Sequence, residues 1–397
     1  MPDGWQPMML GDACADGGTV QTGPFGSQLH AEDYVPEGVP VVMPVNIGDG
    51  RIEARGIARV DEADAMRLAR HRLKAGDIVY SRRGDITRRG LVRREEAGWL
   101  CGTGCLLVRA GRGVDPSWLS YWLATPWVHD WLRGHAVGAT MPNLNTSILS
   151  ALPVELPPLE AQRRIAGVLG ALDDLIDTNQ KISVDLERLL AARFTLAGFD
   201  EPSNDGHRLA DLISINPPYR KPRTDAPYID MAALPTDRAR VASVVQRAPS
   251  GGARFQNGDT VMARITPCLE NGKTAYIDLL GPDEVGIGST EFIVLRSAGP
   301  LGPHWSYFLA RSPRFRESAV QHMSGTSGRQ RCPADAIERY SIAMPDHLAA
   351  SSFAELAEVL FEAIRTLDDE AHQAAHARDE LLPLLLSGRV RVEDVAA

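Results

Sequence analysis

Two pairs of side chains have the types and spacing that could hold a metal ion. Cys101 and Cys105 stand close together, and His372 and His376 lie four residues apart, about one helical turn. A structural zinc site needs four Cys or His ligands, and neither pair is accompanied by a second pair at zinc spacing. We therefore expect buried thiols, a solvent-exposed helix face and no metal site.

The motif Asn216-Pro217-Pro218-Tyr219 could do different chemistry. It matches the signature of amino-methyltransferases, in which the Asn side chain binds the target amino group while the aromatic ring stacks on a flipped base. Such a site needs a parallel α/β domain with a Gly-rich loop that closes on the methyl donor. Gly102-Thr103-Gly104 and Gly286-Ile287-Gly288 precede strand-like runs, which is the wrong order. We interpret the motif as a turn and expect a non-catalytic chain.

Clusters of basic residues suit contact with DNA, because Arg binds phosphate and guanine edges with two parallel hydrogen bonds. A charge cluster is also compatible with an ordinary solvated surface. In the first half the candidates are Arg70, Arg72, Lys74, Arg82, Arg83, Arg88 and Arg89, and in the second half they are Arg220, Lys221, Arg223, Arg254, Arg264 and Lys273.

Two polar loops, residues 138–147 and 324–331, carry residue types that read base edges or bind phosphates. Gly-rich polar loops also occur without any such role. The candidate DNA-binding residues in these loops are Thr140, Asn143, Asn145, Thr326, Ser327, Arg329, Gln330 and Arg331.

The chain repeats five landmarks in the same order at offsets of 182 to 188 residues, which indicates an internal duplication. Gly258 follows Gly76 by 182 residues, and Pro345 follows Pro157 by 188 residues. Three further landmarks lie between them in the same order. Before each Pro, short β-branched runs alternate with Gly and Pro turns, which is typical of a mixed α+β module with several strands.

A long helix is expected after each module. Residues 159–194 contain no Pro, and their apolar residues alternate at spacings of four and three, interrupted only by Asn179. This pattern predicts a heptad seam with one polar core position. The predicted seam residues are Val168, Leu172, Leu175, Ile182, Leu186 and Leu189 in the first helix, and Leu360, Ile364, Leu367, Ala371, Ala374, Leu381 and Leu385 in the second, where Arg378 takes one slot.

Two narrow stripes in one chain most simply bury each other, so we expect an antiparallel coiled coil that separates two similar modules. The 397 residues carry a net charge of −9, and its distribution agrees with this division. Residues 151–205 and 346–397 carry −5 and −7, whereas residues 1–150 and 206–345 carry −1 and +4. The acidity therefore belongs to the helices, and the modules remain free to bind an anionic partner.

These segments resemble the specificity subunits of type I restriction-modification enzymes. The resemblance rests on Leu156–Ile176 at the start of the first long helix, on Gly76–Gly84 and on the closing stretch Leu381–Val390. The order of the parts is also that of the family and covers essentially the whole chain. The second helix departs from the pattern, because His347–Phe353 lacks the Glu-x-Gln-Arg-x-Ile motif that is present at Glu160–Ile165.

The resemblance implies four segments: target recognition domain 1 (1–158), conserved helix 1 (159–198), target recognition domain 2 (199–346) and conserved helix 2 (347–397). It implies that each recognition domain reads one half of a bipartite double-stranded DNA target and that the helices set the unread gap. It also implies that two methyltransferase subunits dock on this chain and methylate adenine with S-adenosylmethionine, with or without restriction (translocase and nuclease) subunits. The residues expected in helix pairing or partner docking are Arg163, Ile165, Leu169, Leu172, Ile176, Leu186, Leu360, Ile364, Leu367 and Leu381.

Two alternatives remain open from the sequence. One is a coiled-coil adaptor that binds proteins and not DNA, and the other, weaker one is an adenine-specific DNA methyltransferase that uses Asn216–Tyr219. No apolar run approaches the roughly 20 residues of a membrane span, and Met1–Gly11 lacks the features of a signal peptide. We therefore expect a cytoplasmic protein.

Overall fold

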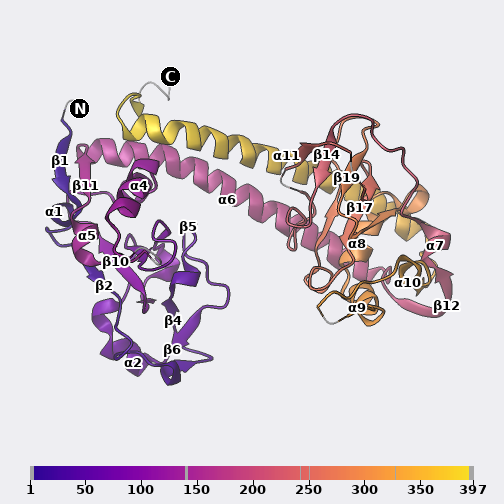
Figure 1. Cartoon of the computed structure of the whole chain (residues 1–397), viewed down its shortest axis with the longest axis horizontal. Coiled ribbons are helices and arrows are strands. Elements are labelled where there is room, and N and C mark those ends of the chain that lie inside the picture. The colour runs from indigo at the N-terminus through magenta and orange to yellow at the C-terminus, as the bar shows by residue number, and fades with distance from the viewer. Residues whose placement is uncertain (1–3, 139–141, 242, 250, 327, 393–397) are drawn as a thin grey trace. The chain divides into compact units, whose positions relative to one another are not determined.

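The computed structural model describes residues 4–138, 142–241, 243–249, 251–326 and 328–392. The chain forms two compact units, which we call unit 1 (residues 1–176 and 373–397) and unit 2 (residues 177–372). Both units mix helices and strands, as expected for an α+β fold (Figure 1). Each long helix contributes residues to both units, so this grouping differs from the four segments expected from the sequence.

Unit 1 contains a five-stranded sheet in the order β2-β10-β7-β8-β5 and a four-stranded sheet in the order β3-β6-β4-β9. A separate antiparallel pair joins β1 to β11. The strands are β1 (Gln6–Met9), β2 (Thr19–Thr22), β3 (Tyr34–Val35), β4 (Val39–Val42), β5 (Asp49–Gly50), β6 (Ala58–Val60), β7 (Ile78–Ser81), β8 (Arg89–Leu91), β9 (Leu100–Cys101), β10 (Cys105–Arg109) and β11 (Pro153–Leu156).

The short helices of unit 1 begin at strong N-terminal signals. Asp115 caps α3 and Thr125 caps α4 through side-chain hydrogen bonds, and each is followed by a Pro whose fixed φ suits the first helical position. Trp118 of α3 packs with Tyr80 of β7 in the core. The helices are α1 (Leu10–Ala13), α2 (Glu62–Arg67), α3 (Pro116–Trp122), α4 (Pro126–His135) and α5 (Thr146–Ser150).

Unit 2 has sheets with closely corresponding connections. Its two four-stranded sheets have the orders β13-β20-β17-β18 and β15-β14-β19-β16, and β12 pairs with β21. The strands are β12 (Pro202–Arg208), β13 (Ser214–Ile215), β14 (Ala226–Ile229), β15 (Val245–Arg247), β16 (Arg254–Phe255), β17 (Thr260–Ala263), β18 (Thr274–Tyr276), β19 (Gly286–Gly288), β20 (Phe292–Arg296) and β21 (Ser341–Ile342).

One short helix of unit 2, α9, begins in the same way. Ser312 caps α9 and is followed by Pro313, as in α4 of unit 1. Phe194, Phe199 and Phe353 lie in van der Waals contact in the core, with ring centroids 5.4–5.8 Å apart. The helices are α7 (Leu209–Leu212), α8 (Trp305–Arg311), α9 (Pro313–Gln321) and α10 (Ala334–Glu338).

Two long helices, α6 (Leu159–Leu196) and α11 (His347–Leu386), pair in an antiparallel arrangement within each unit (Figure 1). In unit 2, Asn179 donates hydrogen bonds to the Leu367 carbonyl and Glu370, while Ser183 bonds Asp368. The polar core position expected at Asn179 is therefore buried, and its amide is satisfied by the facing helix.

In unit 1, Arg378 of α11 binds Asp173 of α6 at 2.8 Å. Leu385 and Leu386, near the end of α11, share the core with Ile165 and Leu169 of α6. The ion pair with Asp173 explains why Arg378 can occupy a position of the predicted apolar stripe of α11, because it replaces an apolar contact there.

The seam predicted for α6 is displaced by about one residue over much of its length. Leu175, Ile182 and Leu189 are 43%, 42% and 47% exposed, whereas Ile176 and Leu190 are buried. Two stripes with 3-4 spacing run along the helix and share Leu172, Asn179 and Leu186. One continues through Leu175, Ile182 and Leu189, and the other continues through Ile176 and Leu190. The buried stripe is the one that meets the globular core as well as α11, and the sequence pattern alone does not contain that information.

The predicted stripe of α11 agrees better with the observed burial. Ile364, Ala371, Ala374 and Leu385 are all buried.

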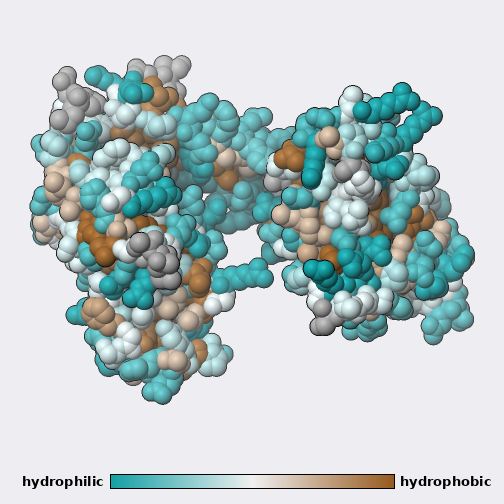
Figure 2. Space-filling view, viewed as in Figure 1, coloured by the Kyte–Doolittle hydropathy of each residue, from teal (hydrophilic) through white to brown (hydrophobic). Residues whose placement is uncertain are grey.

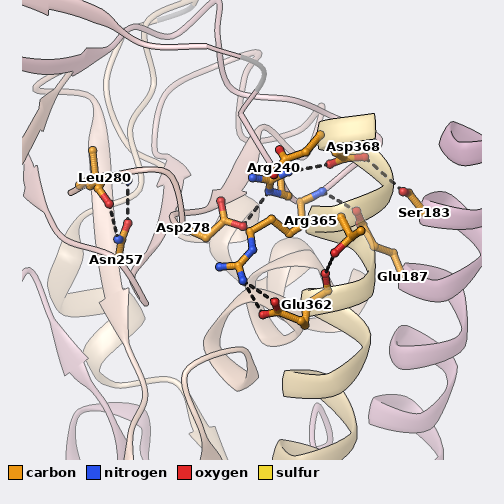
Figure 3. Close-up of polar contacts among 12 residues, drawn as sticks. Ser183, Glu187, Arg240, Asn257, Asp278, Leu280, Glu362, Arg365 and Asp368 are labelled. Atoms are coloured by element: carbon orange, nitrogen blue, oxygen red, sulfur yellow. Dashed lines mark hydrogen bonds and ion pairs between the residues drawn. The ribbon is translucent and has the colours of Figure 1, made fainter. Parts of the chain in front are cut away.

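Polar contacts attach the strands of unit 2 to its helix pair (Figure 3). Arg240 binds Asp278 at 2.7 Å and Asp368 of α11 at 3.3 Å. Glu187 of α6 accepts hydrogen bonds from the Ala239 amide and the Tyr307 hydroxyl. Burial raises the pKa of Glu187 to about 7.

Hydrophobic residues on the visible face lie scattered among hydrophilic ones in both units (Figure 2). In the part of the chain that the structure describes, no helix is long and apolar enough to cross a membrane.

Candidate nucleic-acid interface

A Gly-Asp turn begins the candidate surface in each unit. Gly76 has φ of +89°, a conformation that L side chains rarely adopt. The turn buries Asp77, which accepts a hydrogen bond from Arg109 of β10 at 2.6 Å. Asp259 and Arg296 repeat this contact at 2.5 Å in unit 2. The ion pair fixes the strand that follows each turn, and the candidate arginines come directly after that strand.

In unit 1 the chain after β7 holds the first polar loop. The Leu144 amide donates to the Arg82 carbonyl at 2.9 Å, and Val137 and Asn143 form an antiparallel bridge across the loop. The Arg82 guanidinium also contacts the loop. Its Nε donates to Asn143 Oδ1 and to the Leu144 carbonyl, both at 3.2 Å. Arg82 is therefore a support for the loop.

In unit 2 the corresponding chain holds the second polar loop in the same way. The Cys332 amide donates to the Arg264 carbonyl at 2.8 Å, and Ser324 and Arg331 form the bridge across the loop. The support comes from Glu291, whose two carboxylate oxygens accept from Arg331 Nε at 2.8 and 2.9 Å. These hydrogen bonds lower the pKa of Glu291.

The structure uses several of the expected DNA-binding cations internally. Arg89 is only 4% exposed, and its guanidinium binds the Ser120 carbonyl and Asp49. Arg72 forms an ion pair with Glu62. The Arg89 guanidinium is buried and hydrogen-bonded, so it is not available to a DNA duplex. The sequence-based prediction of Arg89 as a DNA contact is therefore withdrawn.

Other candidates have smaller internal roles. Arg254 donates to the Tyr219 carbonyl, and Lys273 donates to the Met231 carbonyl at 2.6 Å. Arg70 Nε donates to His71. The Asn145 side chain caps α5 by accepting from the Ile148 amide, which is a structural use that the sequence did not reveal.

A second group of candidates is at least partly exposed and makes no side-chain hydrogen bond or ion pair within the described residues. Most of its members are cations, which could reach a phosphate without breaking an internal contact. The group consists of Lys74, Arg83, Arg88, Arg220, Lys221, Arg223, Thr326, Arg329 and Gln330. Thr140 and Ser327 lie outside the described residues.

The Asn216–Tyr219 motif is irregular backbone that bends at Asn216 and lies beside β20. The Asn216 amide donates to the Val294 carbonyl at 2.7 Å, and its Oδ1 accepts from the Val294 amide at 3.0 Å. The Tyr219 hydroxyl donates to Asp259 at 3.1 Å. A cavity of about 420 Å³ adjoins the motif. The neighbouring strand pairs β13-β20 and β20-β17 are antiparallel, so the parallel frame that a methyltransferase site needs is not built here.

The cysteines are all free, and within the described residues no three His, Cys, Asp or Glu side chains gather as a metal site would require. Burial raises the pKa of the Cys105 thiol to about 12. Cys101 and Cys105 are therefore buried thiols in this structure, as expected.

Glu291 was missed in the sequence because a single acidic residue between strand-forming residues gives no signal. The repeat gave no signal either, because the corresponding residue in unit 1 is a glycine. The Arg82 amide donates to the Gly104 carbonyl and the Arg264 amide donates to the Glu291 carbonyl, each at 2.9 Å, so Glu291 occupies the place of Gly104.

Comparison with known proteins gives consistent results. Residues 60–188 match the family model described as the type I restriction modification DNA specificity domain. The chain is 25% identical over 186 residues to the type I restriction enzyme EcoEI specificity subunit of Escherichia coli, a match that covers 45% of this chain and 31% of that protein. It is 24% identical over 311 residues to the MjaIX specificity subunit of Methanocaldococcus jannaschii, covering 71% of each.

The fold also resembles that of a solved specificity subunit. The crystal structure of the type I restriction-modification S subunit from M. genitalium aligns with a TM-score of 0.59 over 96% of both chains, at 13% identity. The relatives are named as specificity subunits, in agreement with a non-catalytic chain. The chain is therefore similar to type I restriction enzyme specificity subunits, and its residues 60–188 match the model of the DNA specificity domain.

Proposed function

We propose that this chain is the non-catalytic, sequence-specific DNA-recognition subunit of a type I restriction-modification complex. Each unit presents a polar loop and exposed cations to one half of a bipartite double-stranded DNA target. The chain needs no cofactor of its own, and S-adenosylmethionine binds the partner methyltransferase.

The observation that carries this proposal is the repeated support of the two loops. The same backbone hydrogen bonds hold the loop that ends at Asn143 and the loop that ends at Arg331. The strand order β2-β10-β7-β8 in unit 1 also corresponds to the order β13-β20-β17-β18 in unit 2. We infer an internal duplication, because two unrelated modules would not share both features.

Exposed cations suit the electrostatic part of the interaction. Arg83 lies next to the first loop, and Arg329 lies within the second. Each cation that neutralises a phosphate releases counterions, so affinity should fall steeply with salt. Base contacts from the loops would supply the specificity.

The helix pair is proposed to set the unread gap and to bind partners. Several residues expected in helix pairing or partner docking, such as Ile165, Leu169 and Ile364, are buried inside the chain and so are not available to a partner subunit. Ile182 and Leu189 of α6 in unit 2 are apolar, exposed and seven residues apart, on one helix face. We propose this face as a docking surface for a methyltransferase subunit, which would bury it.

The test is to map methylated adenines in cellular DNA with and without this chain. The proposal expects one gapped motif to disappear when the chain is absent. An unchanged methylation pattern would sink the proposal, and a purified complex that binds all DNA equally would favour a protein-binding adaptor.

Docking is tested separately by replacing Ile182 and Leu189 with Asp and measuring recovery of the methyltransferase subunit with the full chain. The expected result is loss of recovery, with Arg188→Asp as a control for charge on an exposed neighbouring position. Equal recovery for all variants would rule out this face.

A further inference from the structure

We propose that Arg331, held by Glu291, reads a guanine in one half-site of the DNA target. This inference rests on the proposed DNA-recognition function. It assigns a specificity-determining role to Arg331 and a positioning role to Glu291.

The Glu291 carboxylate occupies one side of the planar Arg331 guanidinium. Arg331 Nε donates to the two carboxylate oxygens at 2.8 and 2.9 Å, and Nη2 donates to Oε1 at 2.7 Å. The Arg331 side chain nevertheless remains 44% exposed, compared with 23% for Glu291. The acid therefore restrains the arginine and leaves part of it accessible.

A count of donors shows what Arg331 can still bind. A guanidinium has five N–H donors. Nε and Nη2 each use one on Glu291, and Nη1 uses one on the Arg329 carbonyl at 3.3 Å. Two N–H groups remain, one on each terminal nitrogen. Guanine presents O6 and N7 as neighbouring acceptors in the major groove, so the remaining donors match its edge.

Both partners lie on backbone that is fixed on either side. Arg331 takes part in backbone bridges to Ser324 and to Ile265. The Glu291 carbonyl accepts from the Arg264 amide at 2.9 Å, and β20 begins at the next residue. A side chain that is already restrained loses less conformational entropy on binding, which favours precise base contact.

Arg329 provides a contrast within the same loop. Its side chain is exposed and makes no hydrogen bond or ion pair within the described residues. An exposed cation without such contacts suits a phosphate, which accepts hydrogen bonds from many directions. The two loop arginines are thus assigned different targets by their surroundings.

The experiment uses the full chain with its methyltransferase partner and maps methylated adenines for four variants. Arg331→Lys keeps the charge and loses the planar fork, so one G·C position in one half-site should become degenerate, with discrimination reduced roughly 10- to 100-fold. Glu291→Gln should relax the same position more weakly. Asn143→Ala should alter the other half-site only, which assigns each half-site to its unit.

Arg339→Lys is the matched control, because Arg339 is an exposed arginine of unit 2 that is paired with Asp335 at 2.9 Å. It should leave the motif unchanged. An unchanged motif for Arg331→Lys, or half-sites that contain no G·C pair, would overturn the inference while the proposed function stands. The absence of any gapped motif with the unaltered chain would instead refute the proposed function.

If Arg331→Lys abolishes methylation, binding decides the matter. The purified complexes are titrated with duplexes that each change one base pair of the half-site. A double-mutant cycle should couple Arg331 to one G·C pair, and no coupling at any G·C pair would overturn the inference.

Discussion

The two units support their loops through the same backbone and differ in the side chains that complete the support. In unit 1 the cation Arg82 donates a hydrogen bond to the side-chain amide oxygen of Asn143. In unit 2 an anion, Glu291, holds the cation Arg331. The backbone position that Glu291 occupies in unit 2 belongs to Gly104 in unit 1.

The comparison distinguishes the structural features that recur in both units from the side chains that differ between them. The Gly-Asp turn and its ion pair to β10 or β20 hold the strand and recur in both units. The side chain presented at the end of the loop, together with its support, can change from amide to guanidinium without altering that frame. If the loops read bases as proposed, a few substitutions would give such a module a new base preference.

The largest expected effect tests whether the two units unfold separately. Phe194→Ala removes a ring from the core of unit 2, where it packs against Phe199, Trp305 and Phe353. The free energy of unfolding of unit 2 should fall by about 3–5 kcal/mol. Hydrogen exchange should show faster opening of β17 and β20, while β7 and β10 of unit 1 keep their protection. Equal loss in both units would contradict separate cores.

The next effect concerns pH and unit 2 alone. The pKa of Glu187 is raised by burial from 4.5 to about 7, so folding binds a proton between these values. The stabilisation from this group is complete below pH 4.5 and is lost as pH rises through 7. Glu187→Gln keeps an acceptor for the Ala239 amide and has no carboxylate to ionise. It should make unit 2 more stable at pH 8 by roughly 1–3 kcal/mol.

Denaturant unfolding at a series of pH values measures this effect. Glu362→Gln is the matched control, because Glu362 is an exposed carboxylate of α11 that is paired with Arg365. Parallel pH profiles for the unaltered chain and Glu187→Gln would show that folding does not shift the pKa of Glu187.

A third comparison distinguishes internal from external arginines in unit 1. Arg89→Ala removes buried hydrogen bonds and should lower the stability of unit 1 by about 2 kcal/mol. Arg83→Ala should leave stability unchanged and reduce the slope of log affinity for DNA against log salt by about 0.9, as expected for one lost phosphate contact. Unfolding and salt-titrated binding measure the two effects, and the reverse assignment would show that Arg83 is structural.

The smallest effect tests the loop support of unit 1. Arg82→Ala loses two hydrogen bonds of 3.2 Å to Asn143 and Leu144. Unit 1 should lose about 1 kcal/mol, with faster amide exchange at Leu144. Unchanged exchange there would mean that the backbone bridge alone holds the loop.

Sequence patterns predicted the features that arise from local chemistry. Gly76 and Gly258 indicated turns, and the absence of Pro after Leu159 indicated the long helix. The buried face of α6 was harder to predict, because 3-4 spacing does not indicate which of two stripes packs against the core. Leu175 and Ile182 were therefore assigned to the seam, although they are exposed.

The candidate site depended more strongly on tertiary contacts. Arg89 and Arg83 look alike in sequence, but Asp49 and the Ser120 carbonyl lie beside only one of them. Glu291 could be found only through its contact with Arg331, which is 40 residues away in the chain. Such pairings are set by the fold and leave no local pattern.

The division of the chain into units has a consequence for the order of folding. Unit 2 is one continuous segment, residues 177–372, whereas unit 1 combines residues 1–176 with residues 373–397. During synthesis unit 2 can form as soon as its own segment has emerged. Unit 1 must wait for Leu385 and Leu386, which fill its core from the end of α11. Residues 1–176 thus form a core that is completed only by residues about 200 positions further along the chain, so a chain that stops before Leu385 leaves unit 1 unfinished.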